Sequence, residues 1–136
     1  MTLSPDRLHA ALRACAAGIH PHEAGTSLLI DSGSWLHRDD FSRFITTGTS
    51  ISDGTTLMAS TDWDAAIASL NAGQLPSSSG ERRMLLLAAS IAAGTPVSLY
   101  DALPGFDQRN ASLEIKAIIH ATGHTHRNTD ASGRTD

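Results

Sequence analysis

Apolar residues recur every three to four positions in several stretches of the chain, and glycine or proline separates these stretches. This spacing is typical of amphipathic helices. The first stretch opens at Ser4 and Pro5, an N-cap serine followed by a proline at the first helical position, and it closes near Gly18. Cys15 falls on the apolar side of this helix, so we expect it to be a small buried hydrophobe.

Two more helices are expected in the N-terminal half. One begins at Pro21 and stops between Asp31 and Gly33. A short one covers residues 37–45, where Phe41 and Phe44 share a face with Ile45.

Residues 46–60 interrupt the helical pattern. They are rich in Thr, Ser and Gly and contain the pair Asp53 and Gly54, which favours a tight hairpin turn. The hydrophobic residues around the pair alternate poorly. We therefore expect a loop that contains at most a short hairpin.

Helix start signals return after residue 60. Thr61 and Asp64 resemble a capping box for a helix that ends at Gly73. Ser78 and Glu81 repeat the pattern ahead of a longer helix, which is apolar over a wide arc. That arc predicts that this helix is the central and most buried one.

Two further elements complete the pattern. Ser98 caps a single turn through Leu103, and the last helix runs from its N-cap Asp107 to Gly123. The residues expected along the apolar side of this last helix are Ala111, Ile115, Ile118, Ile119 and Thr122.

Composition agrees with a helical bundle. The chain has 136 residues, a common size for one domain, and only 4% of them are aromatic. A core of Ala, Leu and Ile suits closely packed helices. The sequence predicts a mainly α fold, a compact bundle of about five to six helices over residues 1–123. Residues 1–45 and 61–123 are candidate lobes, and residues 124–136 are a disordered polar tail.

Cysteine usage and hydropathy indicate the cellular compartment in which the protein is expected. Cys15 is the only cysteine, so no intramolecular disulfide can form. Asp6 and Arg7 interrupt the segment where a signal peptide needs apolar residues, and no apolar run reaches the ~18 residues of a membrane span. We expect a cytoplasmic protein that is not inserted in a membrane.

Charge argues against broad binding of nucleic acid. The formal net charge is −4, and the acidic excess lies entirely in the part of the chain up to Asp64. Lys116 is the only lysine. Such a chain lacks the basic stripe that binding along a duplex requires, although a small local contact stays open.

A weak anion site is predicted at the start of the helix after residue 78. Ser78 and Ser79 offer hydroxyl and backbone N–H groups, and Arg82 and Arg83 offer guanidinium groups. The Walker lysine is missing and Glu81 would repel an anion, so ordinary helix capping is favoured.

Seven histidines raise the question of a metal site. The candidate ligands are His20, His22, His120 and His124. A transition metal requires three or four of them to converge as neutral imidazoles. The alternative is an exposed helix end, where His120 lies favourably at the negative end of the helix dipole.

Residues 85–105, LLLAASIAAGTPVSLYDALPG, resemble a helix-turn-helix. They are similar to the repressor family that includes the lac repressor, which implies contact with DNA. The turn is about two residues shorter than in that family, Pro96 lies within it, and Tyr100 and Asp101 occupy the reading face. The phosphate contacts would come from Arg82, Arg83 and Arg109.

Catalytic motifs give little support to an enzyme. The chain has no G-x-S-x-G elbow, and Cys15 has no evident activating neighbour. Its carboxylate pairs lie beside expected helix starts, where they serve as caps.

The segment from Asp62 to Leu103 resembles a group of small uncharacterised proteins of high-GC actinobacteria. The resemblance implies a cytoplasmic bacterial protein but no activity, cofactor or site residue.

The leading hypothesis is a non-enzymatic helical module without a cofactor that binds a protein partner or itself. A DNA-associated regulator, and an enzyme that binds a metal or an anion, are the alternatives.

Overall fold

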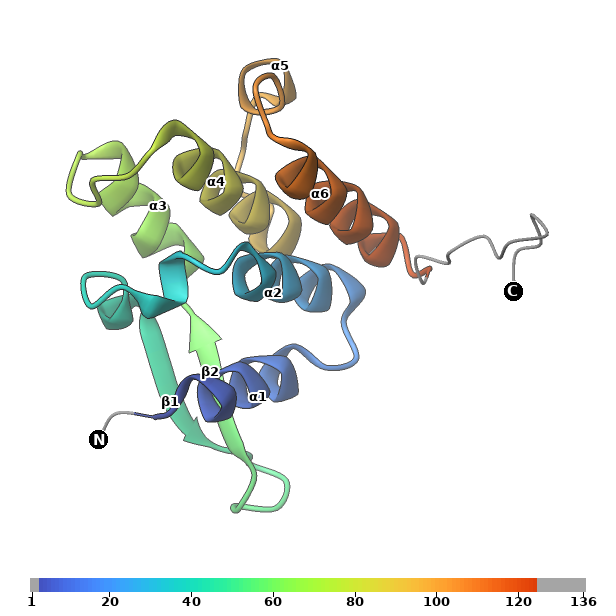
Figure 1. Ribbon diagram of the computed structural model, residues 1–136. Coiled ribbons are helices and arrows are strands. Elements are labelled where there is room, and N and C mark those ends of the chain that lie inside the picture. The colour runs from blue at the N-terminus through green and yellow to red at the C-terminus, as the bar shows by residue number, and fades with distance from the viewer. Residues whose placement is uncertain (1–2, 125–136) are drawn as a thin grey trace.

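The computed structural model describes residues 3–124, and within them the fold is mainly α (Figure 1). Six α-helices and one two-stranded antiparallel sheet are present in this part of the chain, which confirms the predicted class and helix number. The helices are α1 (Pro5–Ala16), α2 (His20–Ser32), α3 (Trp63–Asn71), α4 (Ser79–Ala93), α5 (Leu99–Ala102) and α6 (Gln108–Ala121).

Helix α2 shares the centre of the fold with α4, the helix that was expected there alone. Helix α2 packs against α1, α4 and α6, while α4 also contacts α3 and α5 (Figure 1). At Gly25 the two central helices approach so closely that a Cβ atom would lie 2.7 Å from the carbonyl oxygen of Ala88. Only glycine fits there, because any side chain would overlap the backbone of α4.

The expected helix over residues 37–45 is wrong. The segment instead forms two 3-10 turns, η1 (Trp35–His37) and η2 (Ser42–Phe44), separated by a turn. Trp35 and Phe41 are fully buried, and their ring centroids lie 5.5 Å apart. A single short helix was predicted from spacing alone, whereas packing of these rings into the core decides the local backbone.

A hairpin occupies part of the expected loop region. Strands β1 (Ile45–Thr49) and β2 (Leu57–Thr61) pair antiparallel, with Ile45 opposite Thr61. The connection covers residues 50–56 and is therefore longer than a two-residue turn. Within it, Asp53 accepts hydrogen bonds from the N–H groups of Thr55 and Thr56, both at 2.9 Å. Helix α1 lies against β2 and buries Ala59.

Most helix ends follow the predicted capping residues. Ser78 and Glu81 form the reciprocal capping box at the start of α4, at 3.2 and 3.0 Å. The predicted N-cap of helix α3 is wrong by one residue. The N-cap is Asp62 in place of Thr61, and the Asp62 carboxylate accepts a hydrogen bond from the N–H of Ala65.

The prediction that Cys15 is buried is also wrong, because its side chain is exposed. It does lie near the apolar side of α1, beside the buried Leu12 and Ala16. Helix α4 and strand β2 leave a groove of about 280 Å³ at this end of α1, and Cys15 lines it. The periodicity correctly predicted the direction in which the Cys15 side chain points. Whether the side chain is buried depends on which elements from elsewhere in the chain pack over it.

No helix within residues 3–124 is long and apolar enough to cross a membrane. The disordered tail predicted for residues 124–136 lies almost entirely outside the described residues.

Candidate functional site

Helix α6 presents isoleucines to solvent and a carboxylate to the protein interior. Ile115 and Ile118 are 54% and 47% exposed, and Thr122 is exposed as well, so the expected apolar packing side is wrong for these three residues. Glu114 and Ala117 are the buried residues of this helix. These two residues face α2 and α4, so the helix is rotated away from the predicted orientation.

Glu114 is only 4% exposed, and its Oε2 atom is buried without a hydrogen-bond partner among the described residues. Burial raises the pKa of this carboxyl to about 7. The protonated carboxyl is therefore the stable form below pH about 7, because an isolated charge would lose its hydration.

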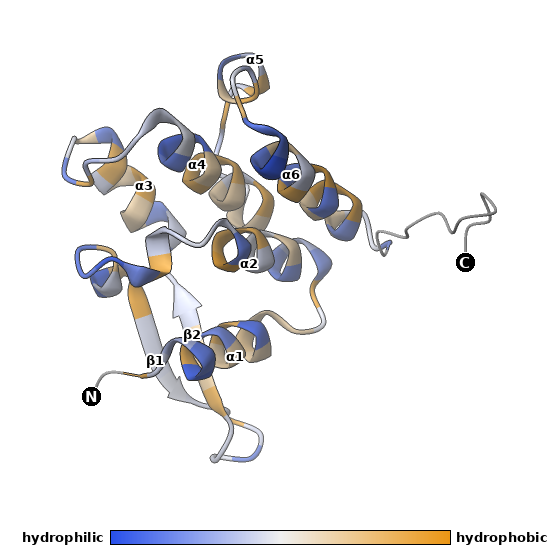
Figure 2. Ribbon diagram, in the orientation of Figure 1, coloured by the Kyte–Doolittle hydropathy of each residue, from blue (hydrophilic) through white to orange (hydrophobic). Residues whose placement is uncertain are grey.

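Further exposed hydrophobic side chains lie on α5 and directly after it. They are Leu99, Tyr100 and Leu103. Helix α5 stands at the N-terminal end of α6 (Figure 1), and both helices carry hydrophobic segments in Figure 2. We call Leu99, Tyr100, Leu103, Ile115 and Ile118 together the α5–α6 face.

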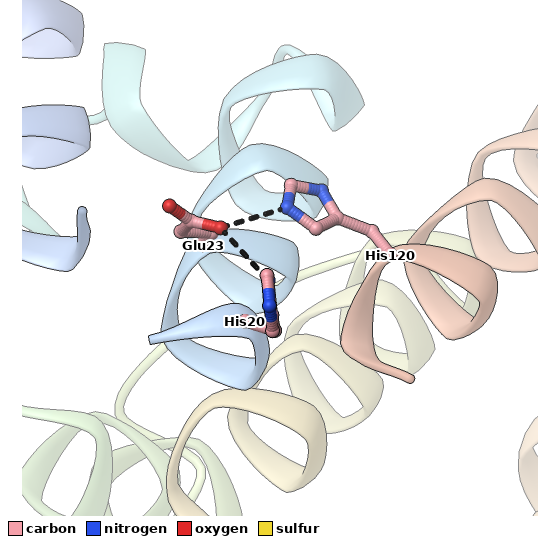
Figure 3. A group of neighbouring side chains, drawn as sticks. All are labelled: His20, Glu23 and His120. Carbon is pink, nitrogen blue, oxygen red and sulfur yellow. Dashed lines mark hydrogen bonds and ion pairs between the residues drawn. The ribbon is translucent and has the colours of Figure 1, made fainter. Parts of the chain in front are cut away.

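Two of the predicted metal ligands come together at the other end of α6 (Figure 3). His20 lies in the first turn of α2 and His120 in the last turn of α6, and these helices pack side by side. Glu23, one turn after His20, places Oε1 3.0 Å from Nε2 of His120 and 3.4 Å from Nδ1 of His20. All three potential ligand atoms lie within 4.8 Å of one another.

A backbone hydrogen bond fixes the orientation of the Glu23 carboxylate. Its Oε2 atom accepts a hydrogen bond of 2.9 Å from the N–H of Gly18, in the turn between α1 and α2. This bond, followed by the contact with His120, lowers the pKa of Glu23. Glu23 is therefore an oriented, ionised carboxylate facing two imidazoles.

The other two predicted ligands lie outside this group. His22 lines the groove beside Cys15. Nδ1 of His124 is 3.0 Å from the hydroxyl of Thr122. The i,i+3 spacing of His20 and Glu23 was the available sequence signal, since it places both side chains on one helix face.

The predicted anion turn is occupied by its own capping interactions. The Ser78 hydroxyl accepts from the N–H of Glu81, and Ser79 is exposed. Arg82 donates to the side-chain oxygen of Asn71 at 3.0 Å. A groove of about 430 Å³ with Ser79, Arg82 and Arg83 on its wall lies beside this turn.

The arginines expected to contact DNA bind the chain itself. Arg83 donates to the carbonyl oxygen of Pro104, and Arg109 donates to that of Asp31 at 2.6 Å. Helix α5, in the second-helix position of the helix-turn-helix resemblance, has four residues. These contacts tie α6 and the loop before it to the central helices.

The chain matches no protein-family model, no curated protein and no solved structure. The resemblance of residues 62–103 to actinobacterial proteins therefore stays a prediction.

Proposed function

We propose that the protein functions as an interaction module that binds a second copy of itself through the α5–α6 face. The observation that carries this proposal is the orientation of α6, in which Ile115 and Ile118 point outward while Glu114 points inward. A helix at a permanent protein surface normally has the opposite arrangement. Each half-exposed isoleucine leaves about 1 kcal/mol of burial free energy to be gained on binding.

The chemistry of the face suits self-association. None of its five residues is charged. In a two-fold dimer a residue near the axis meets its own copy, so a charge there would face a like charge. The exposed charges beside these residues, Asp101 and Lys116, are of opposite sign and can face each other across a two-fold axis. Tyr100, 88% exposed, is of a residue type enriched at the energetic centres of interfaces.

The required area explains why α5 belongs to the face. Helix α6 has 14 residues and is therefore about 21 Å long. One stripe of such a helix covers much less than the ~800 Å² that each subunit of a stable dimer buries. Helix α5 stands at the N-terminal end of α6 (Figure 1), and the exposed Leu99, Tyr100 and Leu103 add further apolar area there.

Light scattering coupled to size exclusion tests the proposal on the full untagged chain. We expect the mass of a dimer for the wild type and of a monomer for Ile118→Asp. Ile51→Asp is the matched control, because Ile51 is fully exposed at the end of the hairpin and outside the face. A wild type that stays monomeric up to about 100 µM would refute self-binding. Equal loss of the dimer in both variants would refute this location.

The DNA-binding alternative is tested in the same experiment. Duplex DNA is added at low salt, where phosphate contacts are strongest. Arg83 and Arg109 already donate to backbone carbonyl groups, so we expect no change in mass. A cytoplasmic location is part of the proposal, because the exposed Cys15 would stay reduced there.

A further inference from the structure

The geometry points to a divalent transition-metal site, of the zinc type, formed by His20, Glu23 and His120. The three side chains come from opposite ends of two helices that are far apart in sequence (Figure 3). Two imidazole nitrogens and one carboxylate oxygen are a ligand set that Zn²⁺ commonly takes in proteins.

The distances within the group suit a tetrahedral ion. Ligands about 2.0–2.1 Å from zinc at tetrahedral angles are about 3.3 Å from one another. Oε1 of Glu23 lies 3.0 Å from Nε2 of His120 and 3.4 Å from Nδ1 of His20. The two imidazole nitrogens lie within 4.8 Å of each other, so rotations of the side chains that shorten this distance by up to about 1.5 Å bring all three atoms around one ion.

The carboxylate is already oriented for this role. The Gly18 N–H holds Oε2 of Glu23, which leaves Oε1 facing the two imidazoles. An outer hydrogen bond of this kind fixes the direction of a ligand before the metal arrives. The turn between α1 and α2 thus acts as a support for the site.

Space for a fourth ligand lies next to the group. A cavity of about 320 Å³ borders Glu23 and His120 and is also lined by Arg13. The Arg13 guanidinium donates to the Ser27 hydroxyl at 2.8 Å and lies 3.7 Å from Asp31. Its positive charge is therefore balanced by another carboxylate, and a water molecule can complete the coordination.

Calorimetric titration of the EDTA-treated, tag-free full chain with ZnCl₂ tests the inference. We expect one Zn²⁺ per chain, with binding at least about 10-fold weaker in Glu23→Gln and His120→Gln. Glutamine keeps a hydrogen-bonding side chain at either position, and circular dichroism verifies that each variant is folded. Binding should also weaken on acidification, because a protonated imidazole has no free lone pair.

His22→Ala is the matched control, since His22 lies on the same helix but faces another groove. A variant that lacks both His124 and His126 controls for the C-terminal histidines. Saturable binding that survives in these controls and is lost in the Glu23 and His120 variants supports the site. Absence of saturable binding, or a loss in either control as large as that in Glu23→Gln, overturns it. Neither result depends on whether the protein forms a dimer.

Discussion

The close approach of α2 and α4 at Gly25 gives the sharpest prediction on stability. A Cβ atom at this position would lie 2.7 Å from the Ala88 carbonyl oxygen, 2.9 Å from the Ala92 nitrogen and also against the Ala92 Cβ. Two of these three atoms belong to the backbone, which cannot rotate aside. Gly25→Ala must therefore push the two central helices apart.

The expected magnitude is the difference between two opposing effects. Alanine within a helix is more favourable than glycine by about 1 kcal/mol. Overpacking a filled interior costs about 1–3 kcal/mol, and contact with rigid backbone places this site at the upper end. The net loss in the free energy of unfolding is about 2 kcal/mol, or about 8 °C in melting temperature for a chain of this size.

Thermal and urea unfolding monitored by circular dichroism measure this loss. Gly80→Ala is the matched control, because the nearest atom to a Cβ there is 3.9 Å away, in Asn110. Helix propensity acts alone at Gly80, so we expect a gain of about 0.5 kcal/mol. If Gly25→Ala were as stable as the wild type, the inferred packing of α2 on α4 would be wrong.

Three further changes test other parts of the structure. Glu114→Gln should remove one contribution to the pH dependence of stability. The folded state raises the pKa of Glu114 from 4.5 to about 7, so the stability that this carboxyl contributes is fully present below pH ~4.5 and is lost as pH rises to ~7. At pH 8 the variant should be more stable than the wild type by about 1–3 kcal/mol, whereas parallel pH profiles of unfolding would contradict a buried, unpaired carboxyl. Ser78→Ala should cost about 1 kcal/mol in urea unfolding because it removes the capping box, and Ser79→Ala, in the next position, should cost much less. Trp35→Phe should cost about 1–3 kcal/mol, because the indole N–H that donates to the Glu81 carbonyl at 2.8 Å is lost; a smaller change in melting temperature than for Ser78→Ala would argue against this bond.

Local signals account for the parts of the fold that were predicted well. The Ser78 and Glu81 side chains bond to backbone groups three residues away, and Gly33 adopts the left-handed conformation that ends α2. Such interactions are complete within a few residues. They can therefore be recognised from the sequence without knowledge of the fold.

The wrong predictions share a different cause. The Phe41 and Phe44 spacing was compatible with a helix, but burial of Trp35 and Phe41 beneath other elements produced 3-10 turns. Cys15 and Ile115 lie on faces that the periodicity treated as apolar, yet both are exposed. Periodicity gives the relative direction of side chains along one helix and does not say which neighbouring element covers them.

The candidate metal group illustrates the same limit. The sequence pointed to His20 and His120 as candidate ligands but offered no means to separate them from His22 and His124. Glu23 is 97 residues away from His120 in the chain, and their contact exists only because α2 packs along α6.

By itself, the sequence determined the mainly α class, most helix boundaries and the lack of an intramolecular disulfide, because these depend on local hydrogen bonds, spacing and composition. The tertiary structure decided the rotation of α6, the inward position of Glu114, the exposed α5–α6 face and the convergence of His20, Glu23 and His120. These features depend on which surfaces pack together, and packing joins residues whose separation in the chain carries no local signal.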